Sequence, residues 1–199
     1  MISVTIDSKS IGETRVLGRV RFEIAEGETL AVVGPSGVGK TTLLRVLAGL
    51  DTDFEGQVAV PERCAMVFQE PALLPWRSAL QNLTLVNGVS DAAARAALGE
   101  VGLRDLADRF PGQLSLGQRR RLSLARAFSA APDMLLMDEP FVSLDAPLVE
   151  EMLELTESLL ASRSIATVFV SHAMEEAQRL ATRIVRLTGS PAVLDDPAP

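Results

Sequence analysis

The chain has 199 residues, a formal net charge of −7, 47% hydrophobic residues and 23% charged residues. This length allows one sizeable core but is too short for two ordinary domains with a linker, and the composition excludes a disordered or collagen-like chain. The negative charge, with Arg119–Arg121 as the one strongly basic run, lacks the electrostatic footprint of a duplex-binding protein, so no nucleic acid partner is expected.

The sequence predicts a cytoplasmic protein. Apolar stretches such as Leu30–Val33 and Met134–Met137 are far shorter than the roughly 18 residues that a membrane-spanning helix requires. The first residues, Met1–Thr5, show no basic region followed by an apolar run. Cys64 is the only cysteine, so no internal disulfide can form, and a buried, inert thiol in a reducing compartment is expected.

The elements, taken in chain order, predict an α/β fold. The stretch Ile2–Ile24 alternates apolar and polar residues, which is typical of an antiparallel sheet. Later apolar runs predict strands covered on both faces, as in a parallel sheet flanked by helices. These runs are Leu30–Val33, Ala65–Phe68, Met134–Met137 and Thr167–Val170. Helical periodicity is found in Thr42–Leu50, Leu116–Ala130, Leu148–Ala161 and Met174–Ala181.

The middle of the chain, Pro71–Gly112, contains no convincing strand, and its alanine-rich piece Asp91–Leu98 predicts a helix. We therefore expect a mainly parallel core sheet flanked by helices, an N-terminal antiparallel β subdomain and an inserted α-helical subdomain. The insertion is expected at approximately residues 71–115 of a single domain over residues 1–199. The tail Pro191–Pro199 is expected to be loosely held.

A glycine-rich segment lies directly between a predicted buried strand and a predicted helix. All four fixed positions of the phosphate-loop (P-loop) pattern are present, and this context favours a phosphate site over a turn without a ligand. The α/β fold is therefore expected to be that of a P-loop NTPase. Its backbone amides would point at phosphate oxygens, Lys40 would contact the outer phosphates and Thr41 would offer its hydroxyl to magnesium. The residues assigned to this site are Gly34, Pro35, Ser36, Gly37, Val38, Gly39, Lys40, Thr41 and Thr42.

Polar residues also follow three other predicted strands. Asp138 suits a magnesium ion held through water, and Glu139 suits orienting or deprotonating an attacking water. An isolated acidic pair would be a solvated strand cap, but a preceding phosphate loop favours chemistry. Gln69 and His172 follow the other two strands, and open α/β sheets bind ligands at the carboxyl ends of their strands. We expect one polar rim around a triphosphate.

The string Leu114-Ser115-Leu116-Gly117-Gln118 opens a predicted helix and is similar to the signature motif of the ATP-binding cassette (ABC) family. The resemblance covers nearly the whole chain in the order phosphate loop, Gln69, helical insertion, signature, acidic strand, Ser143-Leu144-Asp145 and His172. The Asn-Lys-x-Asp motif that reads guanine is missing, which disfavours a GTPase.

The resemblance implies an ATPase that binds ATP and Mg²⁺ at a homodimer interface, between the phosphate loop of one subunit and the signature helix of the other. Asp145 would lie at the subunit contact. The N-terminus of the signature helix would suit the γ-phosphate of ATP. The implied catalytic residues are Glu139, His172 and Gln69, the metal-site residues are Thr41, Gln69 and Asp138, and the signature contacts are Ser115, Gly117 and Gln118.

The segment Glu70–Trp76 resembles the cassettes of nitrate, sulfonate and taurine importers. Proline-flanked apolar residues around Trp76 suit docking to a membrane permease; the alternative is that Trp76 and Leu74 pack inside the helical insertion. The predicted function is an ATP-hydrolysing subunit on the cytoplasmic face of the membrane that energises import of a small anionic or related solute. An external solute-binding protein is expected in the same system.

Two alternatives stay open: a nucleotide-gated ABC subunit that binds ATP without efficient turnover, and an ABC ATPase acting on non-transport machinery. Three positions depart from the family pattern. Leu116 replaces a usual glycine, which would carry a penalty of ~1 kcal/mol or more if the position required positive φ. No aromatic residue occurs between Ile6 and Gly18 to stack adenine, so aliphatic residues such as Ile11 or Val16 would contact the base, and Ala173 replaces a common aspartate.

Overall fold

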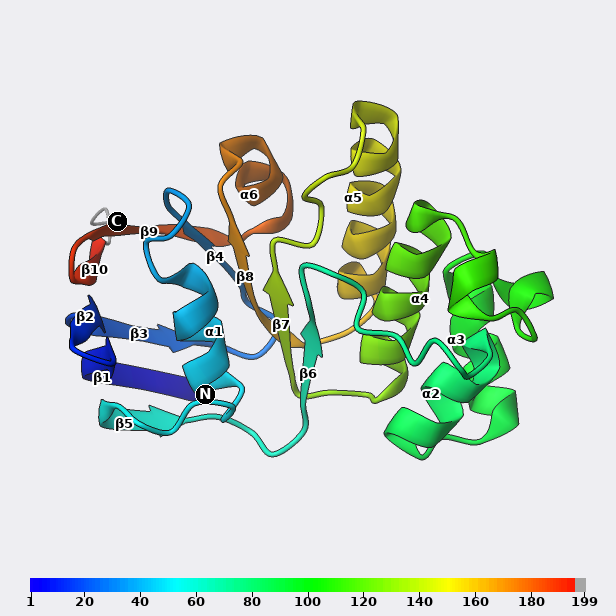
Figure 1. Ribbon diagram of the computed structural model, residues 1–199, viewed down its shortest axis with the longest axis horizontal. Coiled ribbons are helices and arrows are strands. Elements are labelled where there is room, and N and C mark those ends of the chain that lie inside the picture. Colours follow the sequence, from blue (N-terminus) through cyan, green and yellow to red (C-terminus); the bar gives the residue numbers. More distant parts are fainter. Residues whose placement is uncertain (196–199) are drawn as a thin grey trace. The chain divides into compact units, whose positions relative to one another are not determined.

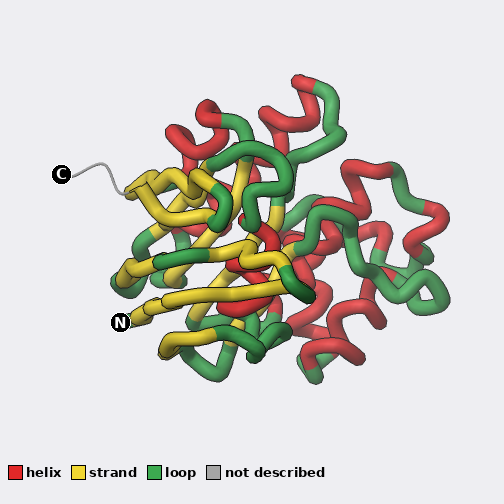
Figure 2. The backbone as a smooth tube through the Cα atoms, turned by 60° about the vertical axis from the view of Figure 1, so that its left-hand side comes forward, coloured by secondary structure: helices red, strands yellow, loops and turns green. Residues whose placement is uncertain are grey.

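The computed structural model describes residues 1–195 and consists of two compact units. The first unit comprises Met1–Met66, Asp133–Glu139 and Arg163–Pro199, and the second comprises Val67–Pro132 and Pro140–Ser162. Figure 1 labels the helices and strands along the chain, and Figure 2 distinguishes them by colour. Strands dominate the first unit and helices the second, which agrees with the predicted α/β fold.

A single sheet organises the first unit. Within the described residues its strand order is β3-β1-β2-β10-β9-β4-β8-β7-β6, and β5 also pairs with β1. Strand β8 is parallel to both β4 and β7, and β9 is parallel to β4 on its other side. The bounds of these core strands are β4 (Thr29–Val33), β6 (Cys64–Val67), β7 (Met134–Asp138), β8 (Ala166–Ser171) and β9 (Arg183–Gly189).

Burial explains why the core strands have no alternating pattern. Every residue of β4, β7 and β8 is buried, so each strand requires apolar side chains on both faces. Helix α1 (Lys40–Leu47) packs on β7 and β8, and helix α6 (Met174–Leu180) packs on β4 and β8. These contacts form the main hydrophobic core of the unit, and they bring the carboxyl ends of β4, β7 and β8 to one edge of the sheet.

The N-terminal strands are antiparallel, as predicted. Strand β1 pairs in this sense with β2, β3 and β5, and its buried residues Ile2, Val4 and Ile6 alternate with less buried ones. The bounds are β1 (Ile2–Ile11), β2 (Thr14–Leu17), β3 (Val20–Ile24) and β5 (Glu55–Ala59). Figure 2 shows these strands lying side by side near the N-terminus.

The prediction of a loosely held tail is wrong for residues Ala192–Asp195, which form strand β10. This strand pairs antiparallel with β9 and parallel with β2, and Ala192 is fully buried. The tail is therefore the segment that joins the antiparallel strands to the parallel core in one sheet. Residues 196–199 lie outside the described part of the chain.

Four helices build the second unit, and its stretch from residue 71 to 112 contains helices and no strand, as predicted. Each helix begins at a side chain whose oxygen accepts a first-turn amide: Ser78, Ser90, Ser115 and Asp145. Helix α4 packs on the other three. The bounds are α2 (Ala79–Asn87), α3 (Asp91–Glu100), α4 (Leu116–Ser129) and α5 (Ala146–Ala161), with 3-10 turns at Arg104–Leu106 and Pro111–Gln113.

Over residues 1–195, none of the helices combines the length and the hydropathy that crossing a membrane requires.

Candidate functional site

The phosphate loop runs from the end of β4 to the start of α1. Gly37 and Gly39 have φ of 79° and 112°, a conformation that side chains with a Cβ rarely adopt. A Cβ on Gly39 would also lie 2.9 Å from Leu17 Cδ2 and 3.1 Å from Val16 Cγ1. The glycines therefore permit both the turn and its close packing on strand β2. The sequence predicted a helix that begins at Thr42, whereas helix α1 begins at Lys40. The last residues of the phosphate-loop motif therefore belong to the first helical turn.

The Lys40 side chain folds back and contacts backbone carbonyls of its own loop. Its Nζ donates to the carbonyl oxygens of Gly34 at 2.9 Å and Pro35 at 3.1 Å, and only 4% of its side chain is exposed. The same ammonium lies 3.1 Å from Glu139 Oε1. A positive charge is thus fixed beside amides of the loop, in surroundings where a phosphate oxygen would be strongly attracted.

Thr41 and Asp138 form a pair of hard oxygen donors. The Thr41 hydroxyl donates to Asp138 Oδ1 at 3.1 Å, across from α1 to the end of β7. Burial raises the pKa of Asp138, while the hydrogen bond from Thr41 opposes this shift. Across the described residues no group of three or more His, Cys, Asp or Glu side chains could hold a metal ion. A hydroxyl and one carboxylate fit the mode in which Mg²⁺ takes its remaining ligands from water and substrate phosphates.

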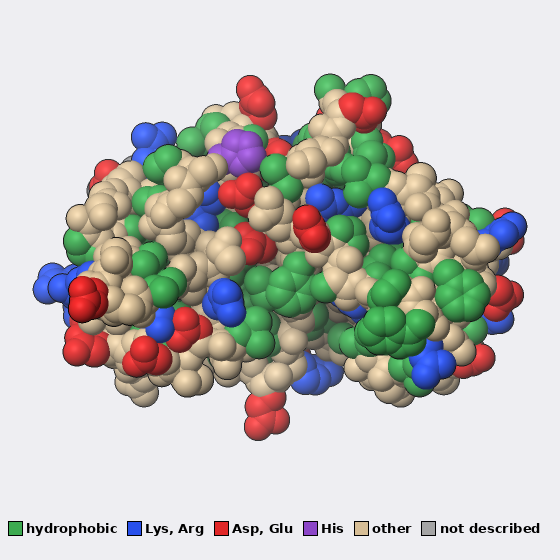
Figure 3. Space-filling view, viewed as in Figure 1, with side chains coloured by type: hydrophobic (Ala, Val, Ile, Leu, Met, Phe, Trp, Pro, Cys, Tyr) green, Lys and Arg blue, Asp and Glu red, His purple; other side chains and the backbone are tan. Residues whose placement is uncertain are grey.

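Glu139 connects the cation of the loop with the histidine that follows β8. Its Oε1 contacts Lys40, and its Oε2 lies 3.2 Å from His172 Nδ1. The backbone of Glu139 has φ of 42°, which is uncommon for a residue other than glycine, and its amide donates to Val170 O at 3.1 Å. The chain therefore turns sharply at the end of β7 and directs the carboxylate to the sheet edge. Figure 3 shows the single histidine, in purple, exposed beside acidic side chains.

Sequence reasoning missed Glu176, which supports the turn at His172. The Ser171 hydroxyl donates to Glu176 Oε2 at 2.5 Å and accepts the Ala173 amide at 2.9 Å. Ala173 caps α6 without a side-chain oxygen, so the Ser171 hydroxyl binds the exposed amide instead. Burial raises the pKa of Glu176 above its ordinary value. The only signal in the sequence is an acidic residue four positions after His172, which has no specificity by itself.

The structure brings together most of the predicted polar rim. Gly34, Asp138, Glu139 and His172 all belong to the first unit and follow adjacent strands β4, β7 and β8. Gln69 belongs to the second unit, so its contribution to the rim stays a prediction.

The signature string forms the start of α4 in the second unit. Ser115 Oγ accepts the Gln118 amide at 3.2 Å, and Gln118 Oε1 accepts the Ser115 amide at 2.9 Å, which is a capping box. The serine hydroxyl can still donate its own proton. Gly117 lies close to α5: a Cβ there would lie 2.9 Å from Leu148 Cδ1, so a larger residue would displace the leucine side chain. First-turn amides and the helix dipole make this N-terminus suited to an anion.

Leu116 does not carry the strain that positive φ would impose. Leu116 is the first residue of α4, its φ angle is not positive, and its side chain is 38% exposed. The substitution of the usual glycine therefore changes the surface beside the helix start and leaves the backbone ordinary. Of the two aliphatic candidates for base contact, Val16 packs against Gly39 of the phosphate loop, whereas Ile11 is 58% exposed at the end of β1.

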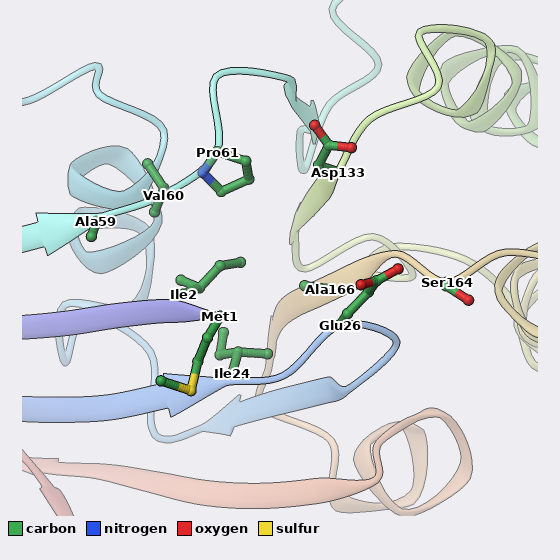
Figure 4. A pocket seen from close by; sticks show the side chains of 10 residues that line it. All are labelled: Met1, Ile2, Ile24, Glu26, Ala59, Val60, Pro61, Asp133, Ser164 and Ala166. Atoms are coloured by element: carbon green, nitrogen blue, oxygen red, sulfur yellow. The ribbon is translucent and has the colours of Figure 1, made fainter.

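A cavity of about 470 Å³ in the first unit lies at the opposite edge of the sheet (Figure 4). Asp133 and Ser164 precede β7 and β8, and Glu26 precedes β4, so the cavity is at the amino ends of the strands. No lysine or arginine is among the residues that line it, and the Asp133 carboxylate is already paired with Arg63, so the cavity offers a polyphosphate no cation. The edge that carries Lys40 and Glu139 therefore stays the candidate nucleotide site.

Comparison with known proteins agrees with this geometry. Residues 17–142 match the family model described as ABC transporter. The chain is 47% identical over 194 residues to "Aliphatic sulfonates import ATP-binding protein SsuB" of Mycobacterium sp. (strain MCS), a match that covers 94% of the chain and 79% of that protein. It is 45% identical over 183 residues to the protein of the same name in Granulibacter bethesdensis, covering 90% of the chain and 76% of the relative.

A further relative, "Aliphatic sulfonates import ATP-binding protein SsuB 1" of Pseudomonas syringae pv. tomato, is 45% identical over 181 residues, which cover 90% of the chain and 67% of the relative. These matches confirm the resemblance to the sulfonate, nitrate and taurine importer type. With its phosphate loop at Lys40 and its acidic strand end at Glu139, the chain belongs to the ABC transporter family, as an ATP-binding subunit that hydrolyses ATP.

Proposed function

We propose that this ATPase subunit energises the import of an aliphatic sulfonate, or a related small anionic solute, through a separate membrane permease. The observation that carries the proposal is the 47% identity over 194 residues to a sulfonate import protein, which spans phosphate loop, signature and histidine alike. The resemblance of Glu70–Trp76 to the same class of cassettes supports it. An external solute-binding protein would deliver the solute, and the subunit would lie on the cytoplasmic face of the membrane.

In this function the phosphate loop binds ATP through its amides and Lys40. Mg²⁺, held at Thr41 and Asp138 and predicted also to lie near Gln69, would neutralise charge on the β- and γ-phosphates. Because Lys40 contacts Glu139 at 3.1 Å, a phosphate that takes the ammonium frees one oxygen of the Glu139 carboxylate. That carboxylate, still within reach of His172, would then orient or deprotonate the attacking water.

The signature helix would complete the site from a second copy of the chain. In the proposed homodimer, the hydroxyl of Ser115 and the amide of Gly117 contact the γ-phosphate of the partner's ATP, while Gln118 holds the cap that orients them. Nucleotide would thus join two surfaces, and hydrolysis would release them. We propose further that both units function together as a single ABC ATPase domain over residues 1–199.

The exposure of Trp76 supports docking of the permease at this segment. Trp76 is 67% exposed, whereas Leu74 is half-buried, so the tryptophan is not packed in the helical interior. The fully buried Asn82 fixes the loop that presents it: its amide nitrogen donates to the carbonyls of Leu74, Arg77 and Ser78, and its oxygen accepts the Leu74 amide. A rigid loop with an exposed tryptophan is typical of a binding hot spot.

The test is phosphate release by the subunit reconstituted with its permease and solute-binding protein in vesicles, with an alkanesulfonate or nitrate as solute. Stimulation by the alkanesulfonate, abolished in Glu139→Gln, is the expected result. If nitrate stimulates phosphate release and the alkanesulfonate does not, the substrate class is nitrate rather than sulfonate. Equal and negligible release by wild type and Glu139→Gln would instead favour a subunit that binds ATP without turnover.

A further inference from the structure

Arg120 is a buried side chain that binds two separate loops of the second unit. It lies on α4, is 5% exposed and forks between two backbone carbonyls. Nη1 donates to Gln69 O, and Nη2 donates to Val142 O at 3.0 Å. A planar guanidinium can satisfy both acceptors at fixed geometry, which a single ammonium cannot reproduce.

The burial of the Arg120 guanidinium indicates that its hydrogen bonds to the two loops, here called the tie, are a specific feature of the fold. Burial lowers the pKa of Arg120, whereas the nearby Glu70 carboxylate raises it, so the protein bears a desolvation cost to place a guanidinium here. The backbone carbonyls of Gln69 and Val142 compensate part of this cost, whereas the buried Nε of Arg120 has no hydrogen-bond partner among the described residues. An uncharged residue would fill the same space without the cost, but it would not hold both carbonyls.

Both tied loops belong to the proposed machinery. Gln69 begins the segment that leads to Trp76, the proposed permease contact. Val142 follows the catalytic Glu139 by three residues, and the next residue, Ser143, has φ of 63°, so this loop needs external support to keep its conformation. The loop ends at Asp145, whose carboxylate accepts the Leu148 amide at 3.0 Å and caps α5.

We propose that Arg120 is a positioning residue that couples the Gln69 loop to the loop following Glu139, so that permease contact at Glu70–Trp76 alters the rate of ATP turnover. This inference rests on the proposed function. Arg120 acts through the two loops and has no part in binding the nucleotide. Its own helix begins at the signature serine, so one rigid element carries the tie and the proposed γ-phosphate contact.

Arg126 provides a matched control on the same helix. It is also buried, burial lowers its pKa in the same way, and its Nη1 donates to Ala72 O at 2.5 Å. It therefore holds the Gln69–Trp76 segment, and among the described residues it makes no hydrogen bond to the loop that contains Val142. Replacing either arginine by lysine removes a buried guanidinium, and only the Arg120 change should release the loop that contains Val142.

The experiment compares Arg120→Lys and Arg126→Lys with wild type, as full chains with and without the permease in vesicles. Arg120→Lys should lower the permease-stimulated kcat about tenfold or more, because misplacing a loop next to the chemistry costs this much. The KM for ATP should stay unchanged, and the melting temperature should fall no further than in Arg126→Lys. Unchanged stimulated kcat in Arg120→Lys, or an equal loss in Arg126→Lys, overturns the proposal.

Hydrogen exchange read by mass spectrometry tests the tie without any turnover. Amides of both residues 69–76 and residues 140–145 should exchange faster in Arg120→Lys, and only the first segment should do so in Arg126→Lys. Faster exchange in one segment alone in Arg120→Lys overturns the coupling. A wild type that releases no more phosphate than Glu139→Gln contradicts the proposed function instead, and the exchange result still decides the role of Arg120.

Discussion

The two units prepare their parts of an ATPase site in different ways. In the first unit the site consists of ionisable side chains that contact one another: Lys40, Glu139 and His172 form a continuous series, with Asp138 held by Thr41 beside them. In the second unit, hydrogen bonds to backbone groups hold the start of α4 and the loops that Arg120 contacts. These bonds come from the capping box of α4 and from buried donors such as Arg120.

This difference indicates which of the two regions must rearrange when ATP binds. In the proposed function a triphosphate would compete with Glu139 for the Lys40 ammonium, so the first region would exchange partners during the cycle. The helix start and the tied loops of the second region already satisfy their own cap and carbonyls, so they would receive a phosphate with little change. Substitutions should therefore affect chemistry in the first region and positioning or stability in the second.

Glu139→Gln should cause the largest effect, a fall in kcat of about 10²–10⁴-fold, because a neutral amide cannot act as the base for water. ATP binding should persist, since Lys40 loses a competitor for the phosphate. The variant should also dimerise more persistently with Mg²⁺ and ATP, and light scattering should detect this. Steady-state phosphate release gives the rate, with Glu154→Gln, an exposed change on α5, as the control.

A Glu139→Gln protein that stays monomeric at every ATP concentration, with its permease present, would contradict the proposed dimer. A rate close to wild type would show that another group activates the water.

Lys40→Ala should weaken ATP binding by about tenfold to a hundredfold, as expected for loss of a charge-assisted hydrogen bond to phosphate. The control is Arg45→Ala, which removes an equal charge from an exposed position of the same helix. Titration with a fluorescent ATP analogue measures both. Equal affinities in Lys40→Ala and wild type would refute the phosphate loop as the nucleotide site, whereas an equal loss in both variants would indicate only a long-range charge effect.

The sequence was sufficient to place groups whose positions depend on local spacing. The phosphate loop, the acidic strand end and the signature cap each occupy a few consecutive residues, and buried strands are recognisable because they are apolar throughout. Parallel pairing of β4, β8 and β7 then brings Gly34, Asp138 and His172 together without further information. The α/β fold was predictable for the same reason.

Contacts between distant segments were not predictable. Nothing in the basic run Arg119–Arg121 distinguishes Arg120 from its neighbours, yet it is buried where two loops 51 and 22 residues away accept its hydrogen bonds. Glu176 became visible only through its contact with Ser171, and strand β10 only through its pairing with β9 and β2. A periodic pattern does not reveal which backbone carbonyl needs a donor.

Gly117→Ala should destabilise the second unit by about 1 kcal/mol or less, because the added methyl would lie 2.9 Å from Leu148 Cδ1 and displace that half-buried side chain, while the higher helix propensity of alanine offsets part of the cost. Gly112→Ala is the matched control, because no atom lies within 4 Å of the Cβ position there. Urea denaturation measures the free energies of unfolding. The double variant with Leu148→Ala should recover part of the loss; if it does not, the defect lies in the helix start rather than in the contact between α4 and α5.

The smallest expected effect is a pH dependence at Glu176. Burial raises its pKa above the ordinary value of 4.5, with the Ser171 hydrogen bond and His172 opposing the shift and Glu139 and Glu175 adding to it. Between 4.5 and the folded-state pKa the folded chain binds a proton that the unfolded chain has lost, so this contribution to stability is complete below pH 4.5 and falls as pH rises. The free energy of unfolding of wild type minus that of Glu176→Gln should therefore decrease as the pH rises from about 4 through the folded-state pKa of Glu176, and then level off.

Urea denaturation at several pH values measures this difference, and Glu175→Gln is the control on the neighbouring, exposed acid of the same helical turn. A difference that stays constant with pH would mean that Glu176 is no less hydrated than an ordinary surface acid. The turn at His172 would then be fixed by the Ser171 hydroxyl and the Ala173 amide alone, and this part of the first unit would be held by backbone contacts in the manner of the second.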